Sequence, residues 1–365
     1  MAKNKANSSA LKVNSGIEKP ATVNVDYLEN MRSLKSKLHD FTYYTKGIVE
    51  GDRNALAQAI TLVESSKSEH RALAEEILQY CITIAKPSVR IGITGVPGVG
   101  KSTFIEAFGK YLTSIGHQVA VLAIDPSSSK HKGSILGDKT RMEMLSVDAN
   151  AFIRPSPSSG SLGGVAQKTR ETISLCEAAG FDVILVETVG VGQSEIAVHS
   201  MVDFFLLLML AGAGDELQGI KRGIIEMSDA LFVNKADGDN ESKAEMSKVQ
   251  YANALHLFPA NDSGWVPVVD TCSAQYGIGI EKVWNTISDY IELTKSNQYF
   301  HKKRQQQELF RLHEQIDAKL KSQFYENSEI KALLKSAENK IVNTNASAYM
   351  LAEELMNFYQ KKSNT

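Results

Sequence analysis

The sequence predicts an α/β fold: a mostly parallel sheet flanked by helices, with a helical cap before it and a helical arm after it. Between residues 89 and 294, short wholly apolar runs alternate with stretches of helical periodicity. Such an alternation is typical of a parallel sheet covered on both faces, which binds its ligands beyond the carboxyl ends of the strands. The candidate strands are Val89–Thr94, Val119–Ile124, Val183–Val186, Phe204–Leu210, Ala230–Val233 and Val266–Val269.

Length and composition limit the class of protein. The chain has 365 residues, 43% hydrophobic and 22% charged, which excludes a disordered or fibrous protein. Its net charge of −2 gives no reason to expect nucleic-acid or membrane-surface binding. Three scattered cysteines favour buried thiols in a reducing compartment. The most apolar run is about half of the roughly 20 residues that span a bilayer, and residues 1–24 lack the apolar core of a signal peptide. We therefore expect a cytoplasmic protein.

Changes in residue pattern divide the chain into four segments. Residues 1–24 are polar and are predicted to form a disordered tail. Residues 25–88 show two helical stretches, the second from about 54 to 85, and residues 89–294 form the α/β domain. Residues 295–365 are helical again. An apolar stripe at helical spacing in this last segment consists of Leu309, Leu312, Ile316, Leu320 and Phe324.

A glycine-rich segment follows the first candidate strand and opens an amphipathic helix. It matches the phosphate-binding pattern GxxxxGK[ST], typical of P-loop nucleotide-binding proteins. The glycines let successive backbone N–H groups point into one concavity, and the helix N-terminus adds positive potential. We expect Lys101 to reach the β- and γ-phosphates and Ser102 to bind Mg²⁺. The expected nucleotide contacts here are Gly95, Gly98, Val99, Gly100, Lys101, Ser102 and Thr103.

A second motif, Asn-Lys-Ala-Asp, ends a later candidate strand and predicts the base. The carboxylate of Asp237 can accept from both the N1–H and the 2-amino group of guanine, and adenine offers no such pair. Asn234 and Lys235 are expected to brace the loops around the base. Ser273 and Ala274, after the last strand, suit a backbone contact to the guanine oxygen, which is a weaker signal. We predict binding of GTP and GDP.

Three carboxylates are candidates for the metal and catalytic roles. Glu187 ends a candidate strand, Asp125 ends another, and Asp138 lies in a Gly-Asp-Lys-Thr-Arg segment. With Lys101 they form the predicted catalytic set, and with Ser102 the predicted Mg²⁺ set. Taken singly, each acid is more often a helix cap or a turn residue. The sequence leaves open which acid binds Mg²⁺ and which orients water.

A glycine-rich, charged loop from Gly212 to Gly223 follows the strand Phe204–Leu210. Composition alone is equally consistent with a flexible loop capped by Asp215 and with a switch that contacts a partner. The position of the loop beside the nucleotide motifs favours the switch, with Asp215 and Lys221 as the charged residues proposed to act in it.

The combined motifs resemble the ArgK/MeaB family of P-loop GTPases over roughly residues 30–330. The resemblance rests on Asp-Pro-Ser-Ser from Asp125, the segment from Gly133 to Met142, the segment Glu187–Glu195, the loop after Gly212 and the Asn-Lys-Ala-Asp motif. It implies a GTPase with bound Mg²⁺. Because no residue after Gly190 is clearly suited to position water, we expect slow turnover in the isolated protein. The resemblance also implies a chaperone that gates adenosylcobalamin loading and protection of methylmalonyl-CoA mutase.

The resemblance also assigns switches and an assembly. The segment around Asp138 resembles a first switch, and Glu187–Glu195, with Gly190 and Gln193, resembles a second. The loop with Asp215 and Lys221 resembles a third switch that responds to the mutase. The C-terminal helices resemble a dimerisation arm, so the expected assembly is a homodimer.

Two other functions use the same phosphate-binding loop. One is an ATP-using kinase or ATPase linked to arginine/ornithine (LAO/AO) transport, and the guanine motif argues against it. The other is a metal-insertion GTPase. Such proteins tend to carry His-rich tracts or Cys-based sites, and the eight histidines here are scattered.

Overall fold

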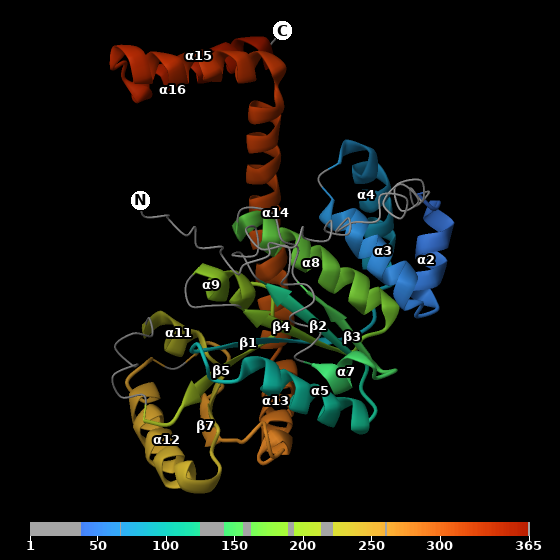
Figure 1. Cartoon of the computed structure of the whole chain (residues 1–365), viewed down its shortest axis with the longest axis vertical. Coiled ribbons are helices and arrows are strands. Elements are labelled where there is room, and N and C mark those ends of the chain that lie inside the picture. Colours follow the sequence, from blue (N-terminus) through green and yellow to red (C-terminus); the bar gives the residue numbers. More distant parts are fainter. Residues whose placement is uncertain are drawn as a thin grey trace, which may run out of the picture.

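The computed structural model describes residues 38–65, 67–124, 142–155, 162–188, 193–212, 222–259 and 261–363. In these residues a seven-stranded sheet has helices on both faces (Figure 1). Its order is β3-β2-β4-β1-β5-β6-β7, and every pairing is parallel. The predicted α/β fold is confirmed. The strands are β1 (Val89–Gly95), β2 (Val119–Ile124), β3 (Ala151–Arg154), β4 (Val183–Thr188), β5 (Phe204–Leu210), β6 (Ala230–Asn234) and β7 (Val268–Thr271).

The strand predictions fail mainly at the two edges of the sheet. The sequence did not predict β3, because it has only four residues, two of them half-buried, and pairs with β2 alone. At the other edge β7 begins at Val268 rather than Val266, whose side chain is 69% exposed. Between the edges, β2, β4, β5 and β6 are almost wholly buried, as their apolar patterns predict.

In the described residues, the N-terminal cap has three helices, which lie against α8 (Figure 1). Asp40 caps the first of them, α2, by accepting from the Tyr43 N–H at 2.9 Å. Because α2 begins at Phe41, Leu38 lies before it in the chain. The predicted stretch from 54 to 85 is two helices, since the chain is extended at Ser65. The first of the two predicted helical stretches in residues 25–88 starts before residue 38, and that part of it lies outside the described residues. The bounds are α2 (Phe41–Val49), α3 (Arg53–Glu64), α4 (Ser68–Thr83) and α8 (Leu162–Ala179).

The remaining helices of the body surround the sheet. No helix in the described part of the chain is both long and apolar enough to cross a membrane. The described helices that surround the sheet are α5 (Lys101–Ser114), α7 (Glu143–Ser146), α9 (Gln193–His199), α11 (Arg222–Met227), the short 3-10 helix η2 (Gly238–Asn240), α12 (Glu241–Leu255) and α13 (Ile280–Ser296).

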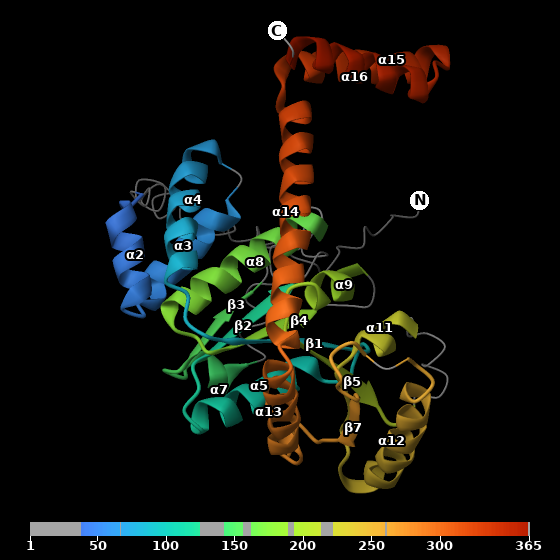
Figure 2. The same ribbon diagram turned by 180° about the vertical axis from the view of Figure 1, so that it is seen from behind.

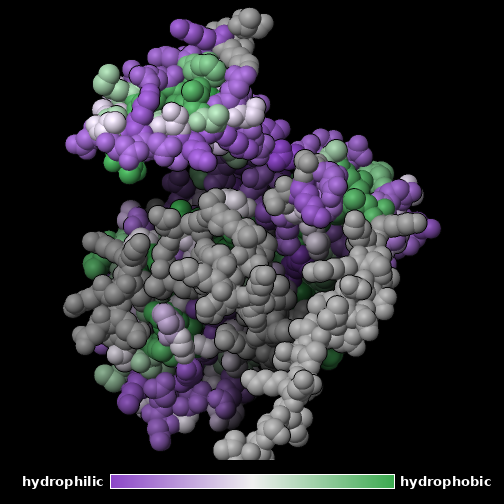
Figure 3. Space-filling model, turned by 45° about the horizontal axis from the view of Figure 1, so that its top comes forward, coloured by the Kyte–Doolittle hydropathy of each residue, from purple (hydrophilic) through white to green (hydrophobic). Residues whose placement is uncertain are grey.

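A long helix, α14 (Tyr299–Glu326), carries the C-terminal segment away from the body, and two further helices lie across its far end (Figures 1 and 2). These are α15 (Ser328–Thr344) and α16 (Ala348–Ser363), and both lie within the C-terminal segment that the sequence predicts to be helical. A small apolar cluster holds them together, formed by Ala337, Leu351 and Leu355 with Phe324 and Leu334. Charged and apolar side chains mix on the surface of this hairpin (Figure 3).

Buried charges fasten the base of α14 to the amino ends of the strands. Arg304 donates to both carboxylate oxygens of Asp203, at 2.8 and 2.7 Å, and to the Ser88 carbonyl at 2.9 Å. Lys303 donates to the Asp203 carbonyl at 2.7 Å. Burial alone would raise the pKa of Asp203, but Arg304 and Arg90 outweigh it, so its pKa lies below the usual 3.8. We call this set the Asp203 clamp.

We predict that Arg304→Met lowers the free energy of unfolding by about 3–5 kcal/mol, because it leaves the Asp203 carboxylate buried with too little positive charge. Urea unfolding measures the loss. The exposed neighbour Lys302, changed to Met, should alter stability by less than about 0.5 kcal/mol. Because the folded pKa of Asp203 is lowered, the loss should be complete above the ordinary pKa of 3.8 and shrink as the pH falls through the folded value. An equal loss in both variants would contradict the clamp.

Candidate nucleotide site

The phosphate-binding loop lies between β1 and α5, at the carboxyl edge of the sheet. Gly95 must be glycine because a Cβ there would lie 2.5 Å from the Leu208 carbonyl oxygen of β5. Gly98 and Gly100 have φ of 78° and 89°, which favour glycine. Gly100 caps α5, and its carbonyl accepts from the Phe104 N–H at 2.9 Å. The result is a helix N-terminus whose first N–H groups have no acceptor within the helix itself, an arrangement that favours anions.

Lys101 is the first residue of α5, and its side chain folds back over the loop. The Nζ atom donates to the Gly95 carbonyl at 2.8 Å. Its pKa lies below the ordinary value because burial of the ammonium outweighs the opposing charges of Glu187 and Glu195. Ser102 and Thr103 follow in the first turn, half-buried and exposed respectively. A partly buried cation at the mouth of this loop suits a polyphosphate.

Asn234 joins the phosphate-binding loop to the loops that follow β6 and β7. Its Nδ2 donates to the Val99 carbonyl at 2.8 Å, and its Oδ1 accepts from the Ala274 N–H at 3.1 Å. The side chain is buried. Lys235, in the left-handed conformation at φ 59°, donates to the Gly98 carbonyl at 2.8 Å. The backbone of Ala236 then bonds to that of Cys272 at 3.0 Å. Three loops therefore form one connected unit.

The predicted base-binding residues lie together at the edge of that unit. Asp237 is half-buried and directly follows the loop, and one of its carboxylate oxygens accepts from the Ser273 hydroxyl. Ser273 and Ala274 are buried, and a short bridge from Ser273 to Ile278 holds their turn. The second oxygen of Asp237 has the chemistry to accept from a ligand amine.

Acidic residues also lie close to Lys101. Glu187 is buried near the end of β4, and Glu195, in the first turn of α9, is fully buried. The neighbouring strand ends are fixed by a hydrogen bond of 2.9 Å from the Thr188 hydroxyl to Thr94. The negative charges of both carboxylates act to raise the pKa of Lys101. The helix α9 follows β4, which pairs directly with β1 in the sheet. The sequence placed Glu195 in a switch without a role, and only the fold brings it to Lys101.

Several predicted site residues lie outside the described part of the chain. These are Asp125, Asp138, Gly190, Asp215 and Lys221. Gln193 is the first residue of α9. In the described residues, no group of three or more His, Cys, Asp or Glu side chains is arranged to hold a metal ion. Ser102 and Glu187, which both lie in the described part of the chain, carry hard oxygen donors of the kind that Mg²⁺ prefers.

Fold and site together define a P-loop nucleotide-binding protein. A family model described as methylmalonyl-CoA mutase-associated GTPase MeaB matches residues 56–329. The GTPase ArgK of Escherichia coli (strain K12) is 44% identical over 311 residues, which cover 85% of this chain and 94% of that protein. The methylmalonic aciduria type A homolog, mitochondrial, of Mus musculus is 43% identical over 347 residues, covering 92% and 83%.

A solved structure agrees with these matches. The crystal structure of an LAO/AO transport system kinase has a TM-score of 0.69 at 36% identity, covering 89% of this chain and all of that one. The chain belongs to the MeaB family of P-loop GTPases. The family implies guanine-nucleotide binding at the loop described above.

Gly100→Ala should weaken guanine-nucleotide binding more than it weakens the fold. An alanine at φ 89° costs about 1–2 kcal/mol, and its Cβ would lie 3.4 Å from Asn234 Nδ2. The resulting shift of the first α5 amides should reduce affinity at least about tenfold, which corresponds to one or two hydrogen bonds.

The matched control is Gly116→Ala, just after the other end of α5. Gly116 has φ of 99°, and a Cβ added to it would have nothing within 4 Å. This variant should show a similar loss in thermal unfolding and unchanged affinity by calorimetric titration. If both variants bound nucleotide like the unaltered chain, the loop geometry would not govern binding.

Proposed function

We propose that this protein is a GTP-binding and GTP-hydrolysing chaperone that gates the loading and protection of adenosylcobalamin in methylmalonyl-CoA mutase. The observation that carries the guanine part is Asp237, held beside Ser273 on a loop that Asn234 fastens to the phosphate site. The mutase part is supported by the description of the matching family, which names that enzyme as the associated protein.

We assign the phosphates to the loop from Gly95 to Thr103, with Lys101 as the positively charged contact. The N–H groups at the start of α5 and the lysine can stabilise charge that develops on a transferring phosphoryl group. Mg²⁺ fits the hard oxygen donors of Ser102 and Glu187, and it would neutralise phosphate charge when bound. Asp125 and Asp138 remain proposed members of the same metal and catalytic set.

Base recognition can be tested by reversing the polarity of one contact. Asp237→Asn replaces an acceptor by an amide that can donate, so it should weaken GTP binding and favour xanthosine triphosphate, which carries an oxygen in place of the 2-amino group. Because one charged hydrogen bond is exchanged, the ratio of the GTP affinity to the xanthosine triphosphate affinity should change by about tenfold or more. Titration of both nucleotides into both proteins measures it. Unchanged GTP affinity would remove Asp237 from the base site.

The partner is tested by GTP turnover with and without a purified adenosylcobalamin-dependent methylmalonyl-CoA mutase. We expect slow turnover alone, faster turnover with the mutase, and none in Lys101→Ala. Lys221→Ala should keep its GTP affinity but respond less to the mutase, because a partner accelerates hydrolysis through groups that act in the competent state. If the mutase does not accelerate GTP turnover by the unaltered protein, the mutase is not the partner. If it accelerates the Lys221→Ala variant equally, Lys221 does not act in a switch that responds to the mutase.

A second candidate function is suggested by the solved relative, described as an LAO/AO transport system kinase. A kinase or transport ATPase would use ATP in the same loop. Comparable binding and hydrolysis of ATP and GTP would favour this function over the GTPase chaperone.

We further propose a homodimer formed through the arm. Four members of the predicted apolar stripe on α14 are exposed: Leu309 by 60%, Leu312 by 52%, Ile316 by 45% and Leu320 by 57%. The sequence also allows the stripe to pack on the core of its own chain, but these four exposed side chains do not do so. Phe324, the last member, packs instead against the α15–α16 hairpin. A second arm would remove this apolar surface from water.

The paired change Leu312→Glu and Ile316→Glu should give a monomer by light scattering, because it places charge in the proposed contact. Lys321→Glu, which adds negative charge away from the stripe on the same helix, should leave the dimer intact. Truncation at residue 296 is a poorer test, since it also removes Arg304 and so the Asp203 clamp. A stripe variant that remains dimeric would exclude this interface.

A further inference from the structure

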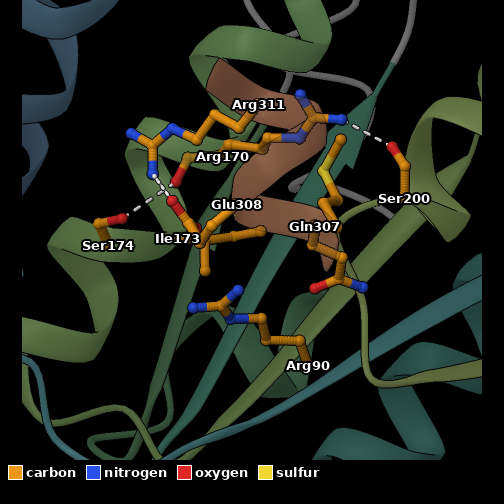
Figure 4. Close-up of a pocket in the computed structure, with 9 residues that line it drawn as sticks. Arg90, Arg170, Ile173, Ser174, Ser200, Gln307, Glu308 and Arg311 are labelled. Carbon is orange, nitrogen blue, oxygen red and sulfur yellow. Dashed lines mark hydrogen bonds and ion pairs between the residues drawn. The ribbon is translucent and has the colours of Figure 1, made fainter. Parts of the chain in front are cut away.

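A small hollow lies where α8, the end of α9 and α14 meet (Figure 4). Arg170 of α8 and Ser200, which directly follows α9, line the hollow and are hydrogen-bonded to each other. Gln307 and Arg311 line it from α14, and Arg90 lines it from β1. The hollow therefore borders the arm, the cap-facing helix α8 and the helix that begins at the nucleotide site.

One side chain, Arg170, connects the three helices. Its guanidinium donates to the Ser200 hydroxyl at 2.6 Å and forms an ion pair with Glu314 in the middle of α14. It also lies over the Phe310 ring, 5.3 Å from the centroid. The Arg170 side chain is only 8% exposed, whereas that of Glu314 is 37% exposed, so water shields the ion pair more than the hydrogen bond to Ser200.

The other end of α9 lies at the nucleotide site. Glu195, in its first turn, is fully buried and acts on the charge of Lys101. A phosphate bound at Lys101 would bring negative charge close to this carboxylate, so the energy of the first turn depends on what the loop holds. A helix of seven residues is only about 10 Å long. The Ser200 N–H still bonds to the Ile196 carbonyl at 3.1 Å, so Ser200 moves with α9.

We propose that Arg170 couples the nucleotide site to the C-terminal arm. A shift of α9 moves Ser200 and changes its hydrogen bond to Arg170, and the ion pair between Arg170 and Glu314 transmits this change to α14. This inference rests on the proposed nucleotide site. The Asp203 clamp fixes the base of α14, and Glu314 lies ten residues beyond Arg304, about 15 Å along the helix. A change at Ser200 therefore acts on a helix held at one end, and the hairpin at its far end moves farther than Glu314.

The contacts around Arg170 leave room for a second arrangement. Its Nε and the Oε1 of Gln307 are buried, and neither has a hydrogen-bond partner within the described ranges. Both residues line the same hollow. A guanidinium whose donors are only partly used can exchange Ser200 for Gln307 at small cost, which is the discrete alternative that coupling between sites requires.

Hydrogen exchange of the full chain, loaded with GDP or with a non-hydrolysable GTP analogue, tests the coupling. Exchange in residues 95–103 reports binding itself, and exchange in residues 308–316 reports the arm. We expect the two nucleotides to change arm exchange by about fivefold or more, a typical coupling between sites. Ser200→Ala and Arg170→Gln should remove that difference while residues 95–103 stay protected.

Arg311→Gln is the matched control. Arg311 lines the same hollow, but its ion pair, at 3.6 Å, is with Glu308 of its own helix. It should keep the full nucleotide-dependent difference. If Arg170→Gln does not fold, the milder Ser200→Ala decides the question alone.

The outcomes separate the two proposals. Protection of residues 95–103 without any nucleotide-dependent change in the arm overturns the coupling and leaves the nucleotide site intact. A Ser200→Ala protein that keeps the full difference also overturns the coupling. No protection of residues 95–103 by either nucleotide overturns the nucleotide site and the coupling together.

Discussion

The buried amide of Asn234 forms hydrogen bonds to both halves of the nucleotide site. Its nitrogen donates to Val99 in the phosphate-binding loop, and its oxygen accepts from Ala274 in the loop after β7. An asparagine serves both contacts because it carries a donor and an acceptor on one planar group. The phosphate loop and the base loop thus take their relative positions before any ligand arrives, which lowers the cost of ordering them on binding.

The two ends of the sheet have different tasks. At the carboxyl ends of β1, β4 and β6 lie Lys101, Glu187 and Asn234, the groups of the nucleotide site. At the amino ends, Asp203 directly precedes β5 and binds Arg304 of the arm. The strands fix the distance between these ends. A change in the nucleotide site therefore has to travel along a face of the sheet, and α9 with Arg170 is the path that the contacts provide.

The sequence was sufficient where a property depends on neighbouring residues. The glycine pattern, Lys101 at the start of a helix and the apolar strands are of this kind, and the bracing role of Asn234 followed from its motif. The sequence was insufficient where residues that lie far apart in the chain form contacts in the fold. Arg170 and Glu314 lie 144 positions apart, and Arg304 and Asp203 lie 101 apart, so no local pattern marks them. The edge strand β3 escaped prediction because four residues show too little periodicity.

Asn234 makes the phosphate loop and the base loop one unit. Titration of inorganic pyrophosphate, which has no base, into the unaltered chain and into Asn234→Ala tests it most directly. Because Asn234 supports Val99 from behind the phosphate loop, we predict that the variant binds pyrophosphate at least about tenfold more weakly, the loss expected for one buried amide–carbonyl contact. Equal pyrophosphate affinity, with only GTP weakened, would show that Asn234 serves the base alone and would contradict the account.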